Sequence, residues 1–221
     1  MTPKAQMVQI PPGEFVMGET TDDKFADETE RPAHRVTIPA FAIARFPVTC
    51  REYRAFAPDH SPDEDPALPV VNVSWQDAQS YCVWLTLQTG HPYRLPTEPE
   101  WEYACRAGSR TPFAWGSEIT PANANFLHDE NCLRVGPGQR TPEGAYPPNA
   151  FGLYDMHGNV CEWVEDPWRP NYLTPPVEAQ RVIRGGAWDY MPRLIRSAWR
   201  DWLQLHHRRD NVGFRLASHS G

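Results

Sequence analysis

The stretch PNAFGLYDMHGNVCEW, residues 148–163, decides the fold of this chain. It places two carboxylates, Asp155 and Glu162, around Gly158 and Asn159, residue types that accept the backbone conformations of sharp turns. Carboxylate oxygens together with main-chain carbonyls form the oxygen shell that calcium prefers. The local chemistry therefore leaves two interpretations open: a turn that binds calcium, or a turn whose acids only accept hydrogen bonds from nearby backbone amides.

Three helix starts are predicted from capping residues. At each, a hydroxyl residue is followed three positions later by an acid, so that each side chain can bond the other's backbone amide. The pairs are Thr49 with Glu52, Ser74 with Asp77, and Thr97 with Glu100. Apolar residues recur at helical spacing after the second and third pairs, which predicts two principal helices near residues 75–88 and 98–106. The first helix is short and ends before Pro58.

Strands and loops are expected to fill the rest of the chain. Alternating apolar residues predict an opening strand pair within 8–17, a strand at 34–38, a strand-like run at 196–200 and a closing strand from Val212. Residues 19–33 are predicted to form an acidic surface loop, and residues 109–147 a long irregular excursion. With 24 prolines and 14 glycines in 221 residues, the composition favours short elements joined by ordered loops. We therefore expect one α+β domain spanning residues 1–221.

Charge and hydropathy exclude several classes of partner. The formal net charge of −7 is spread along the chain, so no basic patch indicates nucleic acid. No apolar run is long enough to span a membrane, and the first residues lack the apolar core of a signal peptide. The expectation is a cytoplasmic protein by default, with display on a cell surface or a phage as the alternative.

Cysteine and histidine are too scattered to predict a metal centre. The five cysteines are an odd and widely spaced set, and Cys82 and Cys105 share helical faces with apolar residues, which favours burial as small hydrophobic side chains over disulfides. The eight histidines show no His-and-carboxylate cluster of the kind that holds non-haem iron. No hydrolase elbow or glycine-rich phosphate loop occurs.

Several motifs together resemble a known family. They are IPPGEFVMG at 10–18, RLPTEPEWEYACRAG at 94–108, GLYDMHGNVCEW at 152–163, and RGGAW, RSAWR and NVGFRLA between 184 and 217. The chain resembles the formylglycine-generating enzyme family, also called the sulfatase-modifying-factor family, along nearly its whole length. The resemblance implies a single-domain C-type-lectin-like fold of the formylglycine-generating-enzyme type, low in regular secondary structure and often stabilised by calcium.

The resemblance also assigns metal ligands. The family's calcium ligands match the side chains of Asp155 and Glu162 and the carbonyls of Gly158 and Val160. Oxidase members of the family use a pair of cysteines in the C-terminal segment to bind copper and activate oxygen. This sequence has no cysteine after Cys161. Because a thiolate is both soft copper ligand and redox partner in that chemistry, we predict no copper and no formylglycine-generating activity.

The segment 184–217 further resembles the variable region of proteins encoded by diversity-generating retroelements, which use the same lectin-like fold. Large, chemically unrelated side chains occupy positions where ordinary family members carry small turn-forming residues, and their identities are those reached when adenines of Asn or Lys codons are replaced. The resemblance predicts a ligand-binding surface made of Asp189, Tyr190, Met191, Arg193, Trp199, Asp201, Trp202, Leu203, Gln204, Leu205, His206, His207, Arg209, Asp210 and Asn211.

Two functions of different classes follow. The first is a non-catalytic display protein that binds a protein ligand through this surface, since aromatic residues and arginine supply most of the binding energy at interfaces. The second is an enzyme of the broader family, such as a tailoring oxidase; a third interpretation is a segment that only packs within the scaffold. Display predicts solvent-exposed variable residues between scaffold residues that are buried or hydrogen-bonded, namely Trp188, Arg196, Ser197, Arg200, Arg208 and Phe214.

Overall fold

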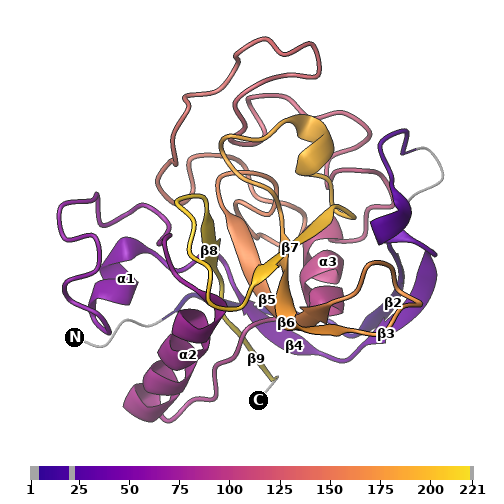
Figure 1. Ribbon diagram of the computed structural model, residues 1–221. Coiled ribbons are helices and arrows are strands. Elements are labelled where there is room, and N and C mark those ends of the chain that lie inside the picture. The colour runs from indigo at the N-terminus through magenta and orange to yellow at the C-terminus, as the bar shows by residue number, and fades with distance from the viewer. Residues whose placement is uncertain (1–4, 20–22, 220–221) are drawn as a thin grey trace.

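The computed structural model describes residues 5–19 and 23–219 (Figure 1). In chain order its elements are β1 (Met7–Ile10), β2 (Gly13–Met17), the 3-10 helix η1 (Glu28–Glu30), β3 (His34–Ile38), β4 (Phe41–Ala44), α1 (Cys50–Arg54), α2 (Trp75–Thr89), α3 (Glu98–Arg106), β5 (Cys161–Trp168), β6 (Val177–Arg184), the 3-10 helix η2 (Pro192–Leu194), β7 (Arg200–Gln204), β8 (Val212–Phe214) and β9 (Ala217–His219). Residues 109–147 contain no helix or strand, as predicted.

The three predicted helix starts are confirmed. Thr49, Ser74 and Thr97 each accept a hydrogen bond from the backbone amide three residues on, and the acid at that position accepts one from the capping residue's own amide. This reciprocal arrangement satisfies two amides that a helix start otherwise leaves without partners. The principal helices therefore begin where the capping pattern places them.

The strands form three small sheets. Strands β7, β6, β5 and β8 make a four-stranded sheet in that order, in which β5 and β8 run parallel and the other pairs antiparallel. Strands β1, β4 and β9 make a second sheet, so both ends of the chain meet on β4. Strands β2 and β3 form a separate two-stranded ribbon. The mixture of helices and sheets confirms the α+β class.

Two expectations for the strands are wrong. The opening strands do not pair with each other, because β1 pairs with β4 and β2 with β3. The strand predicted at 196–200 lies further on, as β7 at 200–204, because Arg196 and Ser197 turn their side chains into buried hydrogen bonds before the chain reaches the sheet edge.

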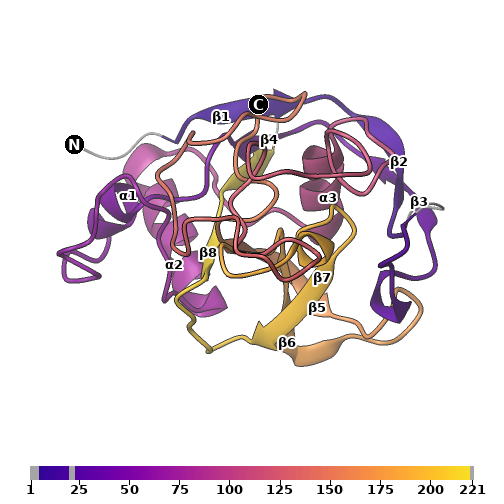
Figure 2. The ribbon, with the colours of Figure 1, turned by 90° about the horizontal axis from the view of Figure 1, so that it is seen from above.

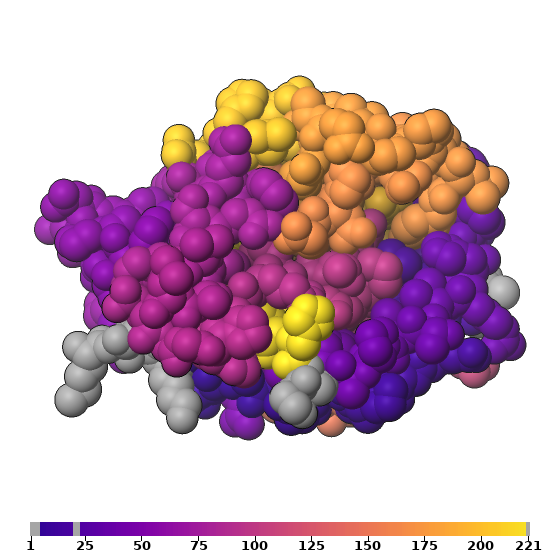
Figure 3. All heavy atoms as spheres, turned by 90° about the horizontal axis from the view of Figure 1, so that it is seen from below, coloured from indigo at the N-terminus to yellow at the C-terminus, as the bar shows by residue number. Residues whose placement is uncertain are grey.

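The core lies on both faces of β5. Trp163 packs with Tyr81 and Leu85 of α2, whereas the next residue, Val164, packs with Trp101 of α3, because successive strand residues point to opposite faces. Figures 1 and 2 show α2 and α3 on either side of the four-stranded sheet. Figure 3 shows the face where β9 emerges, in yellow, between the magenta segment that contains α2 and the indigo N-terminal strands.

Candidate functional site

The turn at 155–162 is built from residues with left-handed backbone. Asp155, Gly158 and Asn159 have φ angles of 56°, 79° and 64°. A Cβ atom at Gly158 would lie 2.2 Å from the carbonyl oxygen of Asn125, so only glycine fits there. The Asn159 side chain accepts from the Thr141 amide and from the Asn125 amide group. These contacts attach the irregular excursion to the start of β5.

The two acids of this turn have different surroundings. Glu162 is fully buried, and Arg215 donates to both of its oxygens at 2.6 Å, while the Trp101 indole donates to one of them at 2.7 Å. Asp155 is 8% exposed, and its Oδ2 atom has no hydrogen-bond partner among the described residues. Burial raises the pKa of Asp155 to about 7, with Arg215 acting in the opposite direction.

Calcium binding at this turn stays a prediction. The orphaned oxygen of Asp155 fits a calcium ligand, whereas the Glu162 carboxylate is already neutralised by Arg215. If the turn binds calcium, a chelator lowers the melting temperature, because an ion bound only to the folded state stabilises it by mass action. We expect Asp155→Asn to lose this sensitivity in differential scanning calorimetry. An identical chelator response in wild type and variant would contradict it.

Arginines anchor the C-terminal segment to the scaffold. Each of five arginines is ion-paired to an acid elsewhere in the chain: Arg184 with Glu102, Arg196 with Glu30 and Asp23, Arg200 with Glu98, Arg208 with Asp77, and Arg215 with Glu162. All but Arg208 are buried. The expected anchoring is confirmed for Arg196, Ser197, Arg200, Arg208 and Phe214, and Trp188 is half-buried with its backbone amide donating to Asn159.

The predicted surface loop at 19–33 is more than a surface loop in its described part, residue 19 and residues 23–33; residues 20–22 lie outside the described residues. Its Glu30 is fully buried, and Arg196 donates to it at 2.6 Å and 2.9 Å. Desolvation raises the pKa of Glu30, and Arg196 opposes that shift. This contact could not be predicted from the sequence, because its two partners are separated by 166 residues.

Most of the expected ligand-binding residues lie at the surface between these anchors. Seven are exposed: Asp189, Arg193, Trp202, His206, His207, Arg209 and Asp210. Five are half-buried: Tyr190, Met191, Asp201, Gln204 and Leu205. The Asn211 amide donates to both oxygens of Asp189 at 3.1 Å, so the loop at 189–193 lies beside the loop at 205–211. The structure thus brings the two loops together on one surface.

Three of the expected ligand-binding residues need correction. Trp199, Leu203 and Asn211 are only 6%, 3% and 6% exposed and cannot reach a ligand at the surface. Leu203 follows Trp202 on β7 and therefore points to the opposite, core-facing side. Trp199 packs in the same cluster and contacts the Tyr190 ring edge-on at 5.6 Å.

A buried thiol and imidazole also lie together, on the core side of this segment. Cys105 Sγ is 3.5 Å from Nε2 of His157. The His157 Nδ1 atom donates to the Ile195 carbonyl at 2.7 Å, which leaves Nε2 as an acceptor from the Ala114 amide. Burial lowers the pKa of His157 to about 4 and raises that of Cys105 to about 12, so both groups are neutral. The pair is packing and not an activated nucleophile.

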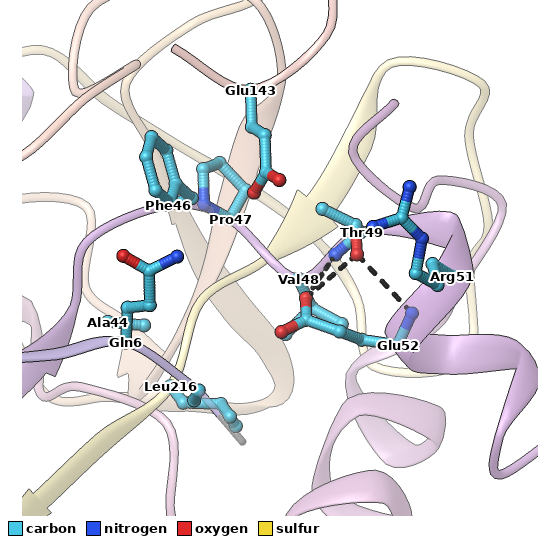
Figure 4. A pocket seen from close by; sticks show the side chains of 11 residues that line it. Gln6, Ala44, Phe46, Pro47, Val48, Thr49, Arg51, Glu52, Glu143 and Leu216 are labelled. Atoms are coloured by element: carbon cyan, nitrogen blue, oxygen red, sulfur yellow. Dashed lines mark hydrogen bonds between the residues drawn. The ribbon is translucent and has the colours of Figure 1, made fainter. Parts of the chain in front are cut away.

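Two cavities are relevant to ligand binding. One, of about 560 Å³, lies between residues 23–25, 112–135 and η2. A smaller one, of about 220 Å³, lies beside α1, where Glu143 and the capping residue Glu52 face the same space (Figure 4). Desolvation raises the pKa of both carboxyls, and Glu52 raises that of Glu143 further. Glu52 is held by Thr49, so its main role is to start α1.

The described part of the chain contains neither a cluster of metal-ligating side chains nor a membrane-spanning helix. Within 5–19 and 23–219, no three His, Cys, Asp or Glu side chains are grouped so that they could hold a metal ion. Over the same residues, no helix has both the length and the apolar character needed to cross a membrane.

Comparison with known proteins identifies the family. The family described as "Sulfatase-modifying factor enzyme 1-like domain" matches residues 1–220. The chain belongs to this family. It is 30% identical to a formylglycine-generating enzyme from Bos taurus, covering 98% of this chain and 75% of that protein. It is 32% identical to a hercynine oxygenase from Mycolicibacterium smegmatis, covering 95% of this chain but only 60% of that protein. The family also includes a mouse protein named inactive C-alpha-formylglycine-generating enzyme 2, 31% identical over 97% of this chain and 86% of its own length.

Solved structures place this family member in a C-type-lectin-like fold that is shared with variable proteins. PvdO from Pseudomonas aeruginosa is similar with a TM-score of 0.85 and 34% identity, over 97% of this chain and 94% of its own. Treponema denticola variable protein 1 has a TM-score of 0.82 at 21% identity, over 97% and 95% of the two chains. The family contains proteins named as enzymes and a protein named as inactive, so membership alone does not decide whether this chain is an enzyme.

Proposed function

We propose that this family member is a non-catalytic display protein that binds a protein ligand through the surface formed by the loops at 189–193 and 205–211 and the exposed side of β7. The observation that carries the proposal is the alternation of anchored and exposed side chains along the C-terminal segment. Five arginines attach the segment to the scaffold, and exposed Trp202, His206 and His207 lie between them. Such a surface tolerates changes without loss of the fold.

The chemistry of the exposed set also supports protein binding. Trp202 is 37% exposed on the edge strand β7. A few residues further along the chain, the rings of His206 and His207 pack edge-on, with their centroids 4.8 Å apart. Aromatic side chains supply large contact areas at low entropic cost. The match to a variable protein at 21% identity supports the fold that such display requires.

A matched pair of variants tests this function. The display variant replaces Trp202, Gln204, His206 and His207 with alanine. The control variant replaces Val83, Leu87 and Leu173 with alanine; these three residues are exposed and lie outside the C-terminal segment. Each is immobilised beside wild type, and the proteins retained from a lysate of the source organism are quantified by mass spectrometry. We expect a partner that wild type and control retain and that the display variant loses at least about tenfold, the effect of removing about 1.4 kcal/mol of contact energy. Equal retention by all three would contradict the proposal.

The DNA supplies an independent measurement. A diversified segment requires a neighbouring reverse transcriptase gene and a near-copy of the coding sequence for residues 184–217 with adenines at the variable codons. Sequencing the locus therefore tests whether the surface is diversified, separately from whether it binds a protein.

The runner-up function is an enzyme of the broader family. Its support is the 30% and 32% identity to proteins named as a formylglycine-generating enzyme and a hercynine oxygenase. The chain has no cysteine after Cys161, which argues against the copper and cysteine chemistry of the former. Conversion of a cysteine-bearing sulfatase peptide to formylglycine by the purified protein, with copper added, would favour the enzyme.

A further inference from the structure

The larger cavity is walled by three segments that are far apart in sequence. Residues 23–25, the excursion at 112–135 and η2 meet there around about 560 Å³, within the size range of ligand pockets. Phe113 and Phe126 are buried residues of its wall, 4% and 1% exposed. Phe25, Ile119 and Pro192 line it as half-buried residues. The cavity therefore offers an aromatic and aliphatic lining to an apolar group.

Ion pairs fix the shape of this cavity. Arg196 is bound by Asp23 and Glu30 and donates to the Phe25 carbonyl, which holds the loop at 23–25 against η2. On the other side, the Arg193 amide donates to Glu130 at 2.7 Å. These bonds join each neighbouring wall to η2, so the cavity is largely preformed in the free protein.

Acidic side chains outnumber basic ones in the cavity lining. Among the described residues, it has four carboxylates, Asp23, Glu118, Asp129 and Glu130, against three cationic side chains, Lys24, Arg193 and Arg196. Asp23 and Glu130 pair with the two arginines. Glu118 has no ion-pair partner in the described part of the chain, and the Asp129 carboxylate accepts from the backbone amides of Asn131 and Leu133 in its own loop. A cationic group at the mouth would therefore be favoured over an anionic one.

The cavity is continuous with the proposed display surface. Arg193 belongs to both. Its guanidinium Nη2 atom donates to the sulfur of the half-buried Met191 at 3.3 Å. Interfaces draw most of their energy from anchors that fill a pocket near an exposed surface. A partner bound to the loop at 189–193 would therefore lie close enough to insert one side chain here.

We propose that this cavity is the anchor pocket of the display surface and that it takes an aromatic or aliphatic side chain of the protein partner with a positive charge beside it. This inference rests on the proposed function and names the chemistry of the partner. The lining selects the apolar body, and Glu118 and Asp129 select the adjacent cation.

Small probes test the pocket without the partner. Phenethylamine and 3-phenylpropionate share an aromatic body and differ in the sign of their charge. Each is titrated into methyl-labelled protein, and NMR shifts are followed at Ile119 and Val135 in the cavity and at Val83 and Leu87 on α2 as internal controls. We expect shifts only at the cavity methyls, with phenethylamine binding about 5- to 10-fold more tightly than the carboxylate.

Two variants sharpen the result. Glu118→Gln combined with Asp129→Asn removes the preference for the amine while the aromatic body still binds, and Ile119→Trp fills the cavity and weakens both probes. Equal affinity for the two probes, or shifts at the control methyls alone, would overturn the inference.

Variants of the display surface distinguish a failure of the pocket from a failure of the display function. Trp202→Ala and His206→Ala leave phenethylamine binding unchanged and reduce partner retention if the display surface acts as proposed. If the probes fail but those variants still lose the partner, only the anchor pocket is wrong. If the probes bind and the variants retain every partner, the display function is wrong, and the cavity binds an aromatic cation without serving as an anchor for that surface.

Discussion

Glu102→Gln is expected to lower the free energy of unfolding by about 3–5 kcal/mol, because it leaves buried guanidinium charge without its carboxylate. Glu102 is fully buried and binds three separate parts of the chain. Its carboxylate accepts from the Gly18 amide at 2.9 Å, pairs with Arg106 at 2.8 Å, and pairs with Arg184 at the end of β6. A glutamine keeps the shape of the side chain and loses the charge.

The exposed pair of Glu14 with Arg35 is the matched control. Its closest contact is 3.6 Å and both side chains are largely in solvent, so Glu14→Gln should change stability by about 1 kcal/mol or less. Urea denaturation of wild type and the two variants measures both effects. A Glu102→Gln protein as stable as Glu14→Gln would show that the buried network contributes no net stability.

Trp199→Ala is expected to cost about 3–5 kcal/mol, whereas Trp202→Ala should cost about 1 kcal/mol or less. The two tryptophans lie three residues apart in the same segment. Trp199 is packed against Tyr190 in the main core, while Trp202 is the exposed residue of β7. The comparison separates scaffold from surface with one type of substitution.

Leu203→Ala extends this comparison to the residue whose expected exposure was wrong. Its side chain is buried in the main cluster, so we expect a loss of about 2–5 kcal/mol. Thermal unfolding of the three variants gives the ranking. If Trp202→Ala proved as costly as Trp199→Ala, the segment would be scaffold throughout, and the display function would lose its basis.

The helices could be predicted from the sequence because their signals are local. Ser74 and Asp77 are three residues apart, and their mutual hydrogen bonds need only the first turn of the helix to form. Strand pairing depends on partners far along the chain. The turn at Pro11 and Pro12 therefore could not predict that β1 pairs with β4 and β2 with β3.

For the candidate site, too, the sequence predicted the local features and not the long-range contacts. The motifs located the C-terminal segment and three of its five anchoring arginines, Arg196, Arg200 and Arg208. They did not locate the acids that pair with them, because those acids lie in distant parts of the chain. The burial of Leu203 depends on the register of β7 with β6, which pairs Leu203 with Arg181 and Trp202 with Val182. No residue within the segment specifies that register.

The anchored arginines have a consequence for the thermodynamics of binding. A flexible loop loses conformational entropy when it binds, and that loss opposes association by about 0.5–1.5 kcal/mol for each side chain that becomes ordered. Here Arg184, Arg196, Arg200 and Arg208 divide the segment into short spans whose ends are already fixed in the free protein. The backbone of these spans therefore loses its conformational entropy during folding and not on binding. Replacing exposed residues would change the contacts offered to a ligand, while the loss of backbone entropy on binding would stay small.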